Sequence, residues 1–181
     1  MKVLVLGASG IIGQHMRLCV PDGFEPVWYR READALHKGA DLSDEGLVHD
    51  VLMTEQPAVV INLAGESRVD IVERDPQAYT RLNVGLPQQI AAWASERDAK
   101  YVHISTQACY VEPVNEYGRQ KKTAEDAVPT NPPAVADATV AEYRSILYIG
   151  PTGACLDQGT LYAIKFFLLL AFHKECSPGD L

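Results

Sequence analysis

The chain has 181 residues, of which 47% are hydrophobic and 22% charged, a composition that is ordinary for a folded globular domain. Its 16 basic and 24 acidic side chains give a formal net charge of −8, which disfavours nucleic acid and acidic membrane surfaces as partners. Histidines and cysteines are dispersed without the spacings of a zinc site, so we expect no metal centre.

The predicted elements alternate between short apolar segments and helical ones. In chain order we expect a strand at 3–6, a helix at 11–18, a strand at 24–29, a helix at 43–55, a strand at 59–63, a helix at 76–96, a strand at 101–105, a helix at 116–128 and a strand at 145–149. Strands that are apolar throughout are typical of a parallel sheet covered on both faces. The pattern therefore predicts an α/β fold with a doubly wound, Rossmann-type parallel sheet.

Residues 1–151 are expected to form this domain, and residues 152–181 do not continue the pattern. The longest apolar run, 161–172, is too short to span a bilayer and predicts a buried helix rather than a membrane segment. Four scattered cysteines and the lack of a charged targeting region before the first strand predict a cytoplasmic protein.

A glycine-rich loop joins the first predicted strand to the first helix. Its sequence, GASGIIG, places glycines where a chain turns sharply, approaches a pyrophosphate and packs a helix close to a strand. The candidate cofactor-binding residues of this loop are Gly7, Ser9, Gly10, Ile11, Ile12 and Gly13. An ordinary tight turn is the competing interpretation.

Two arginines, Arg30 and Arg31, follow the second predicted strand, where an NAD site would place an acidic residue. A guanidinium suits a 2′-phosphate because it donates charge-assisted, often bidentate hydrogen bonds. We therefore expect NADP(H) as the preferred cofactor, with NAD(H) as the alternative. Both arginines could instead be solvated charges, and Glu32 lies close by.

A YxxxK pattern lies in the last helix predicted before residue 130. Tyr117 and Lys121 are four residues apart, so they share one helix face, and the lysine charge can stabilise a phenolate. Thr106 follows the preceding strand and could hold the same carbonyl oxygen that the tyrosine protonates. The three residues are candidate catalytic groups for carbonyl reduction.

Taken together, these motifs resemble the extended short-chain dehydrogenase/reductases, the NAD-dependent epimerase/dehydratase superfamily, and most of all the dTDP-4-dehydrorhamnose reductase branch. The shared segments are GASGIIG (7–13), ADL (40–42), VVINLAG (59–65), VDIVERDPQAYTRLNV (69–84), HISTQA (103–108) and NEYGRQK (115–121). The resemblance covers roughly residues 1–128, with a weaker match at 143–151. It implies NADPH-dependent reduction of a 4-keto group on a nucleotide-linked sugar.

The resemblance also implies roles for single residues. Asp41 and Leu42 would flank the adenine, Leu63, Ala64 and Gly65 would contact the cofactor, and Asn83 would support the active site. Thr106 would orient the substrate carbonyl, Tyr117 would act as the acid, and Lys121 would hold the nicotinamide ribose and tune Tyr117. Taken singly, Asp41 could be a turn residue, Asn83 a polar helix residue and Thr106 an ordinary strand-end hydroxyl.

Three departures from the family pattern keep other functions open. Thr106 and Tyr117 are closer in sequence than in the family, Gln107 stands where an acidic residue is usual, and the C-terminal substrate subdomain is reduced or incompletely represented. Residues 152–181 are either the ordered part of that subdomain or its remnant. The alternatives are a non-catalytic, NADP-binding regulatory module and an NAD-dependent nucleotide-sugar epimerase or dehydratase. A homodimer would use the helices predicted at 76–96 and 116–128.

Overall fold

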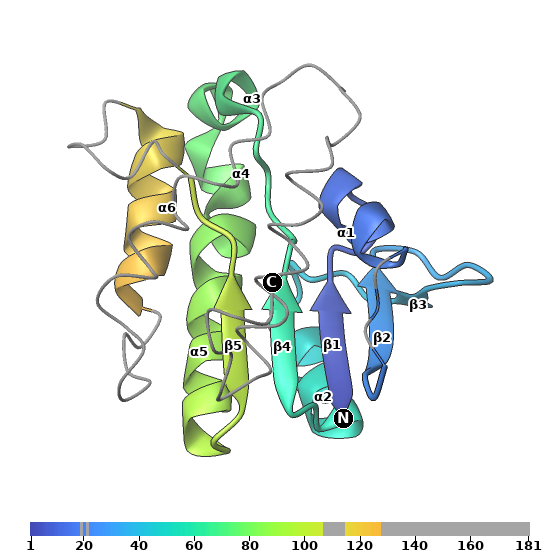
Figure 1. Ribbon diagram of the computed structural model, residues 1–181. Coiled ribbons are helices and arrows are strands. Elements are labelled where there is room, and N and C mark those ends of the chain that lie inside the picture. Colours follow the sequence, from blue (N-terminus) through green and yellow to red (C-terminus); the bar gives the residue numbers. More distant parts are fainter. Residues whose placement is uncertain (19, 21, 107–114, 128–181) are drawn as a thin grey trace, which may run out of the picture.

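The computed structural model describes residues 1–18, 20, 22–106 and 115–127 (Figure 1). Five parallel strands form one sheet, in the order β3-β2-β1-β4-β5. Their bounds are β1 Lys2–Leu6, β2 Glu25–Arg30, β3 Lys38–Gly39, β4 Val59–Asn62 and β5 Lys100–His103. This order confirms the predicted Rossmann-type parallel sheet. The strand predicted at 145–149, the helix at 161–172 and the domain boundary at 151 lie outside the described residues.

Strand β1 is the centre of the sheet and the point where its order reverses. The chain adds β2 and β3 on one side of β1 and then returns to add β4 and β5 on the other side. Because β1 and β4 are neighbouring parallel strands, the loops that leave their carboxyl ends begin side by side at this point. Ligands of open α/β sheets bind at such a switch point.

Helices lie on both faces of the sheet, as the apolar strands predict. Their bounds are α1 Ile11–Met16, α2 Glu45–Glu55, α3 Val69–Arg74, α4 Pro76–Thr80, α5 Leu86–Glu96 and α6 Glu116–Ala127, with a π-helical turn, η1, at Arg81–Gly85. Side chains of α2 and α5 pack with Leu4, Leu6 and Val60 on one face. Met16 of α1 packs with Val3 and Val5 on the other face.

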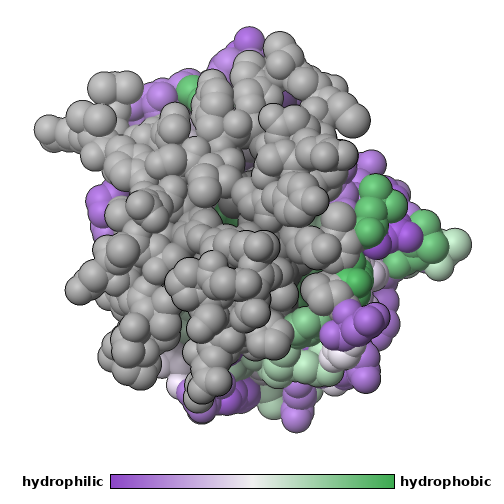
Figure 2. Space-filling model, viewed as in Figure 1, coloured by the Kyte–Doolittle hydropathy of each residue, from purple (hydrophilic) through white to green (hydrophobic). Residues whose placement is uncertain are grey.

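Helix α6 stands beside α5 at the β5 end of the sheet and packs on α3, α4 and η1 as well (Figure 1). At the opposite end, α1 leaves exposed apolar side chains, among them Ile11 and the nearby Leu18. Figure 2 shows apolar surface on the side of the molecule where Figure 1 places α1 and the loop between β2 and β3. None of the helices in the described residues is long and apolar enough to cross a membrane.

The single helix predicted at 76–96 is divided in the structure. Residues 76–80 and 86–96 are α-helical, but the Leu86 N–H bonds to the Arg81 carbonyl, five residues back, in the π-helical turn η1. Pro87 explains the change, because a proline in a helix has no N–H to give the carbonyl four residues earlier. The sequence also did not predict α3 or the two-residue strand β3, and β5 ends two residues earlier than expected.

Candidate functional site

The loops after β1 and β4 touch at the switch point. Gly7 has a φ of +76°, and a Cβ placed on it would lie 2.6 Å from the Ala64 backbone nitrogen. A side chain at residue 7 is therefore excluded by both conformation and space. The contact brings the predicted glycine loop against residues 63–65, the other segment expected to contact the cofactor.

The glycine loop also packs tightly against the start of α1. The Gly10 N–H donates to the Gly7 carbonyl over 3.1 Å, which closes the turn. A Cβ on Gly13 would lie 2.6 Å from the Ala8 Cα, so only glycine allows this approach. Ser9 and Ile11 are exposed, whereas Ile12 packs against the apolar core. A loop bounded by backbone in this way fits the close approach of a pyrophosphate.

The two arginines at the end of β2, Arg30 within the strand and Arg31 directly after it, have different surroundings. Nη1 of Arg30 lies 2.7 Å from Oδ2 of Asp34, in an ion pair at the protein surface. Asp34 also accepts from the Leu36 and His37 backbone N–H groups. The Leu36 N–H, the His37 ring and the Arg30 guanidinium hold the pKa of Asp34 far below its usual range. Arg31 is exposed. The predicted preference for NADP(H) therefore rests on two arginines, of which Arg30 already has an acidic partner.

The predicted adenine-flanking residues form a turn before α2. Oδ1 of Asp41 accepts from the Ser43 hydroxyl at 2.7 Å and from the Ser43 N–H at 3.0 Å, and these bonds lower the pKa of Asp41. The Leu42 side chain is buried in the core, 7% exposed. Only the backbone of residue 42 could therefore contact an adenine, while Asp41 has the turn-forming role that the sequence left open.

Asn83 connects the loop after β4 with α6. It lies in η1 and is 2% exposed. Its Oδ1 accepts from the Glu66 N–H at 2.9 Å, and its Nδ2 donates to the Glu66 carbonyl at 3.2 Å and to Oε1 of Gln120 at 3.0 Å. The amide thus satisfies both backbone groups of Glu66 and fixes the loop that begins at Leu63.

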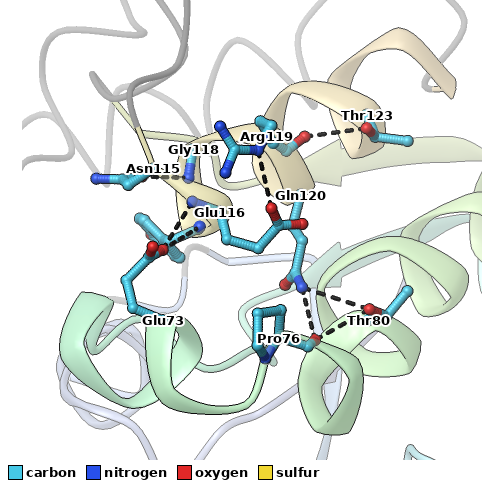
Figure 3. Close-up of polar contacts among 10 residues, drawn as sticks. Glu73, Pro76, Thr80, Asn115, Glu116, Gly118, Arg119, Gln120 and Thr123 are labelled. Carbon is cyan, nitrogen blue, oxygen red and sulfur yellow. Dashed lines mark hydrogen bonds and ion pairs between the residues drawn. The ribbon is translucent and has the colours of Figure 1, made fainter.

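Two long-range polar contacts anchor α6 (Figure 3). Oε1 of Glu73, in α3, accepts from the Glu116 N–H at 2.7 Å and from the Tyr117 N–H at 3.1 Å. One turn further along α6, Nε2 of Gln120 donates to the Pro76 carbonyl at 2.8 Å. The contacts orient α6 because they fix it at two successive turns against α3 and α4.

The predicted catalytic residues lie at the carboxyl end of β5 and on the adjoining helix. Tyr117 and Lys121 occupy successive turns of α6, and Tyr117 is 8% exposed. Nζ of Lys121 lies 3.2 Å from Nε2 of His103, the last residue of β5, and it also donates to the Ile104 carbonyl. Thr106 follows two residues later and is partly buried. Lys121 therefore joins α6 directly to the strand end that leads to Thr106.

Sequence reasoning missed three polar residues of this region. Gln120 lies inside the YxxxK motif, so the sequence spacing predicts its position on the helix. Its hydrogen-bond partners, Asn83 and the Pro76 carbonyl, could not be predicted in this way. Glu73 is 43 residues from Glu116, and no local pattern joins them. His103 ends a strand whose side-chain surroundings depend on which helix covers it. Among the described residues, no group of three or more His, Cys, Asp or Glu side chains could hold a metal ion.

Comparison with known protein families identifies the family of this chain. The family of the RmlD substrate binding domain matches residues 1–141. The chain belongs to this family. The extended short-chain dehydrogenase/reductase resemblance predicted from the sequence is thereby confirmed.

Individual relatives divide between two kinds of protein. The chain is 31% identical over 147 residues to methionine adenosyltransferase 2 subunit beta of Rattus norvegicus, covering 72% of this chain and 43% of the relative. It is 28% identical over 138 residues to dTDP-4-keto-6-deoxy-D-glucose reductase of Streptomyces niveus, covering 69% of this chain and 46% of the relative. The chain thus spans less than half the length of either protein.

Solved structures likewise match most of this chain but only about half of their own length. A hypothetical dTDP-4-dehydrorhamnose reductase from Sulfolobus tokodaii superposes with a TM-score of 0.63 at 26% identity, covering 70% of this chain and 51% of the other. A UDP-glucose 4-epimerase from Brucella ovis, solved in complex with NAD, superposes with a TM-score of 0.59 at 27% identity, covering 69% and 46%.

Proposed function

We propose that the protein is an NADPH-dependent reductase of a 4-keto group on a nucleotide-linked sugar. The observation that carries this proposal is the placement of Tyr117 and Lys121 on successive turns of α6, with Lys121 tied to the end of β5 beside Thr106. Membership of the RmlD family and the similarity to a dTDP-sugar reductase support the same substrate class.

Reduction of a ketone to an alcohol adds a hydride to the carbon and a proton to the oxygen. NADPH, when bound, supplies the hydride. Tyr117 would donate its phenolic proton to the developing alkoxide, while the positive charge of Lys121 favours the phenolate that remains. The Thr106 hydroxyl would donate a hydrogen bond to the same oxygen as negative charge develops on it.

The cofactor would bind across the switch point, within a domain that we assign to residues 1–151. Gly7, Gly10 and Gly13 would admit the pyrophosphate, because each lacks a side chain where the backbone is crowded or sharply turned. Residues 63–65 would contact the nicotinamide half by their backbone, and Asn83 would hold that loop in place. We assign the 2′-phosphate chiefly to Arg31, because Arg30 already pairs with Asp34.

The test is NADPH consumption by the purified protein with dTDP-4-keto-6-deoxyglucose, followed by absorbance. Oxidation that requires both the sugar and Tyr117 would support the reductase. The Tyr117→Phe variant keeps the ring and loses only the hydroxyl, so it should bind NADPH normally and lose turnover. NADPH binding without any sugar-dependent oxidation would contradict the proposal. Release of tightly held NAD from the purified protein would favour an epimerase instead.

A second candidate function is a subunit of another enzyme. It is favoured by the 31% identity to a protein named methionine adenosyltransferase 2 subunit beta. The two functions separate in one experiment, in which purified methionine adenosyltransferase is titrated with wild-type protein and with Tyr117→Phe. A subunit would bind the enzyme equally well in both forms, because the phenolic hydroxyl would have no chemical task.

A further inference from the structure

A chain of hydrogen bonds runs behind the predicted catalytic lysine, from β4 through β5 to α6. Nδ2 of Asn62 lies 3.4 Å from the Tyr101 hydroxyl, and this hydroxyl lies 3.4 Å from Nδ1 of His103. On its other side, Nε2 of His103 lies 3.2 Å from Nζ of Lys121. Asn62 is 1% exposed, and the aromatic side chains of Tyr101 and His103 are partly buried.

The direction of each bond follows from what each group can donate. A lysine ammonium has three N–H groups and no acceptor, so Nε2 of His103 must offer its lone pair to Lys121. The single proton of the neutral imidazole then sits on Nδ1, which faces the Tyr101 hydroxyl. Burial, followed by the charge of Lys121, lowers the pKa of His103 to about 2, so the ring stays neutral throughout the physiological range.

The far end of the chain reaches the loop after β4. Oδ1 of Asn62 accepts from the Ala64 N–H at 3.0 Å, and Ala64 packs against Gly7. The same set of bonds therefore touches the loop proposed to contact the cofactor and the lysine proposed to hold its ribose. Three of its side chains come from strands of the sheet, Asn62 from β4 and Tyr101 and His103 from β5.

We propose that His103 is a positioning residue of the reductase site, which fixes the Lys121 ammonium by accepting a hydrogen bond from it at Nε2. The inference rests on the proposed function, since it gives Lys121 its task. Tyr101 and Asn62 hold the imidazole in one tautomer and one orientation. Lys121 is thereby anchored to the end of β5, through His103 and the Ile104 carbonyl. This anchoring fixes the position of its charge relative to Tyr117, which lies one turn earlier in α6.

The competing explanation is that His103 merely fills space under α6. Two substitutions separate the explanations. His103→Phe keeps a ring of similar size but removes both nitrogens, whereas His103→Gln keeps an acceptor near the place of Nε2. Tyr29→Phe is the matched control, because it removes a buried hydroxyl that bonds to Glu55 in a different part of the core.

Steady-state kinetics with NADPH and dTDP-4-keto-6-deoxyglucose supply the first measurement. We expect His103→Phe to lower kcat on the order of a hundredfold with little change in KM for the sugar, because a displaced charge misaligns the proton donor. His103→Gln should recover most of this loss, and Tyr29→Phe should retain wild-type kcat. Wild-type kcat in His103→Phe would overturn the proposal. Turnover missing from the wild-type protein would instead contradict the proposed function.

Nitrogen-15 NMR of labelled histidine supplies a measurement that does not need turnover. His103 should show the neutral Nδ1–H tautomer between about pH 5 and 8, where an ordinary histidine titrates. In Lys121→Met, which removes the donor but keeps a long side chain, that tautomer preference should weaken. A His103 that titrates normally, or that carries its proton on Nε2 in the wild-type protein, would refute the positioning role even in an inactive protein.

Discussion

Oε1 of Glu73 accepts a hydrogen bond from the backbone N–H of Tyr117, and the two atoms lie 3.1 Å apart. The same oxygen accepts from the Glu116 N–H at 2.7 Å. The first N–H groups of a helix have no partner within it, and a carboxylate there also interacts favourably with the helix dipole. A side chain of α3 therefore caps the helix that carries the predicted catalytic tyrosine.

The cap predicts a specific loss in Glu73→Ala. Losing a capping side chain costs about 1 kcal/mol of unfolding free energy, and we expect a loss of that size here. Amide hydrogen exchange should accelerate at residues 116 and 117, whose N–H groups Glu73 caps. Asp70→Ala is the control, because this exposed carboxylate belongs to the same helix and contacts only Arg74 among the described ion pairs. Equal exchange in the two variants would contradict the capping role.

Gly13→Ala tests the close approach of α1 to the glycine loop. The added Cβ would lie 2.6 Å from the Ala8 Cα, and backbone atoms on both sides must shift to admit it. We expect a loss of about 1–3 kcal/mol in unfolding free energy, together with weaker NADPH binding. Gly46→Ala, in the first turn of α2, is the control. Its Cβ meets only the Asp44 carboxylate at 3.3 Å, and alanine favours a helix, so thermal unfolding should show no loss.

The two arginines at the end of β2, Arg30 and Arg31, should contribute unequally to the choice between NADPH and NADH. Removing Arg31 should weaken NADPH binding about 10–100-fold, the effect of losing a charged hydrogen bond, and should leave NADH binding unchanged. Arg30→Ala should have a smaller effect, because Asp34 already neutralises the Arg30 guanidinium. Titration calorimetry with both cofactors checks the order. A larger loss in Arg30→Ala than in Arg31→Ala would show that the ion pair opens to bind the phosphate.

A buried carboxylate predicts how stability depends on pH. Glu55 is 5% exposed, and it accepts from Nζ of Lys38 at 2.6 Å and from the Tyr29 hydroxyl at 3.0 Å. Burial raises the pKa of Glu55, but the bonds from Lys38 and Tyr29 outweigh burial and the net pKa is lowered. Because the folded pKa lies below the unfolded value of about 4.3, this stabilisation is complete above that value and is lost as pH falls through the folded pKa.

Glu55→Gln should therefore lower the unfolding free energy at neutral pH by about 1–3 kcal/mol, since the hydrogen-bonded charge is lost while Lys38 can return to water. The variant should also lose less stability than the wild type on acidification below about pH 4. Urea unfolding at several pH values measures both effects. Glu45→Gln, at an exposed site on the same helix, should behave as the wild type, and a parallel acid response of all three proteins would contradict the role of Glu55.

Local patterns were sufficient for the sheet and for the positions of the main motifs. The apolar run of β1 and the glycines after it each depend on residues within a few positions, and the structure has them where the sequence predicts them. The division of 76–96 was missed because Pro87 shifts the bonding of a turn whose apolar pattern still indicates one continuous helix. The same turn carries Asn83, which is buried and bonded to Glu66.

The sequence by itself determined the parallel α/β class and the helix face shared by Tyr117 and Lys121, because periodicity and spacing are properties of neighbouring residues. The family followed from the resemblance of its motifs, which the family match confirms. Only the tertiary structure decided that Arg30 pairs with Asp34, that Glu73 caps α6 and that His103 stands behind Lys121. Hydrogen bonds and ion pairs form between atoms about 3 Å apart in space, whatever the separation of the two residues in the sequence. Partners 43 or 18 residues apart become visible only when the fold has brought their atoms together.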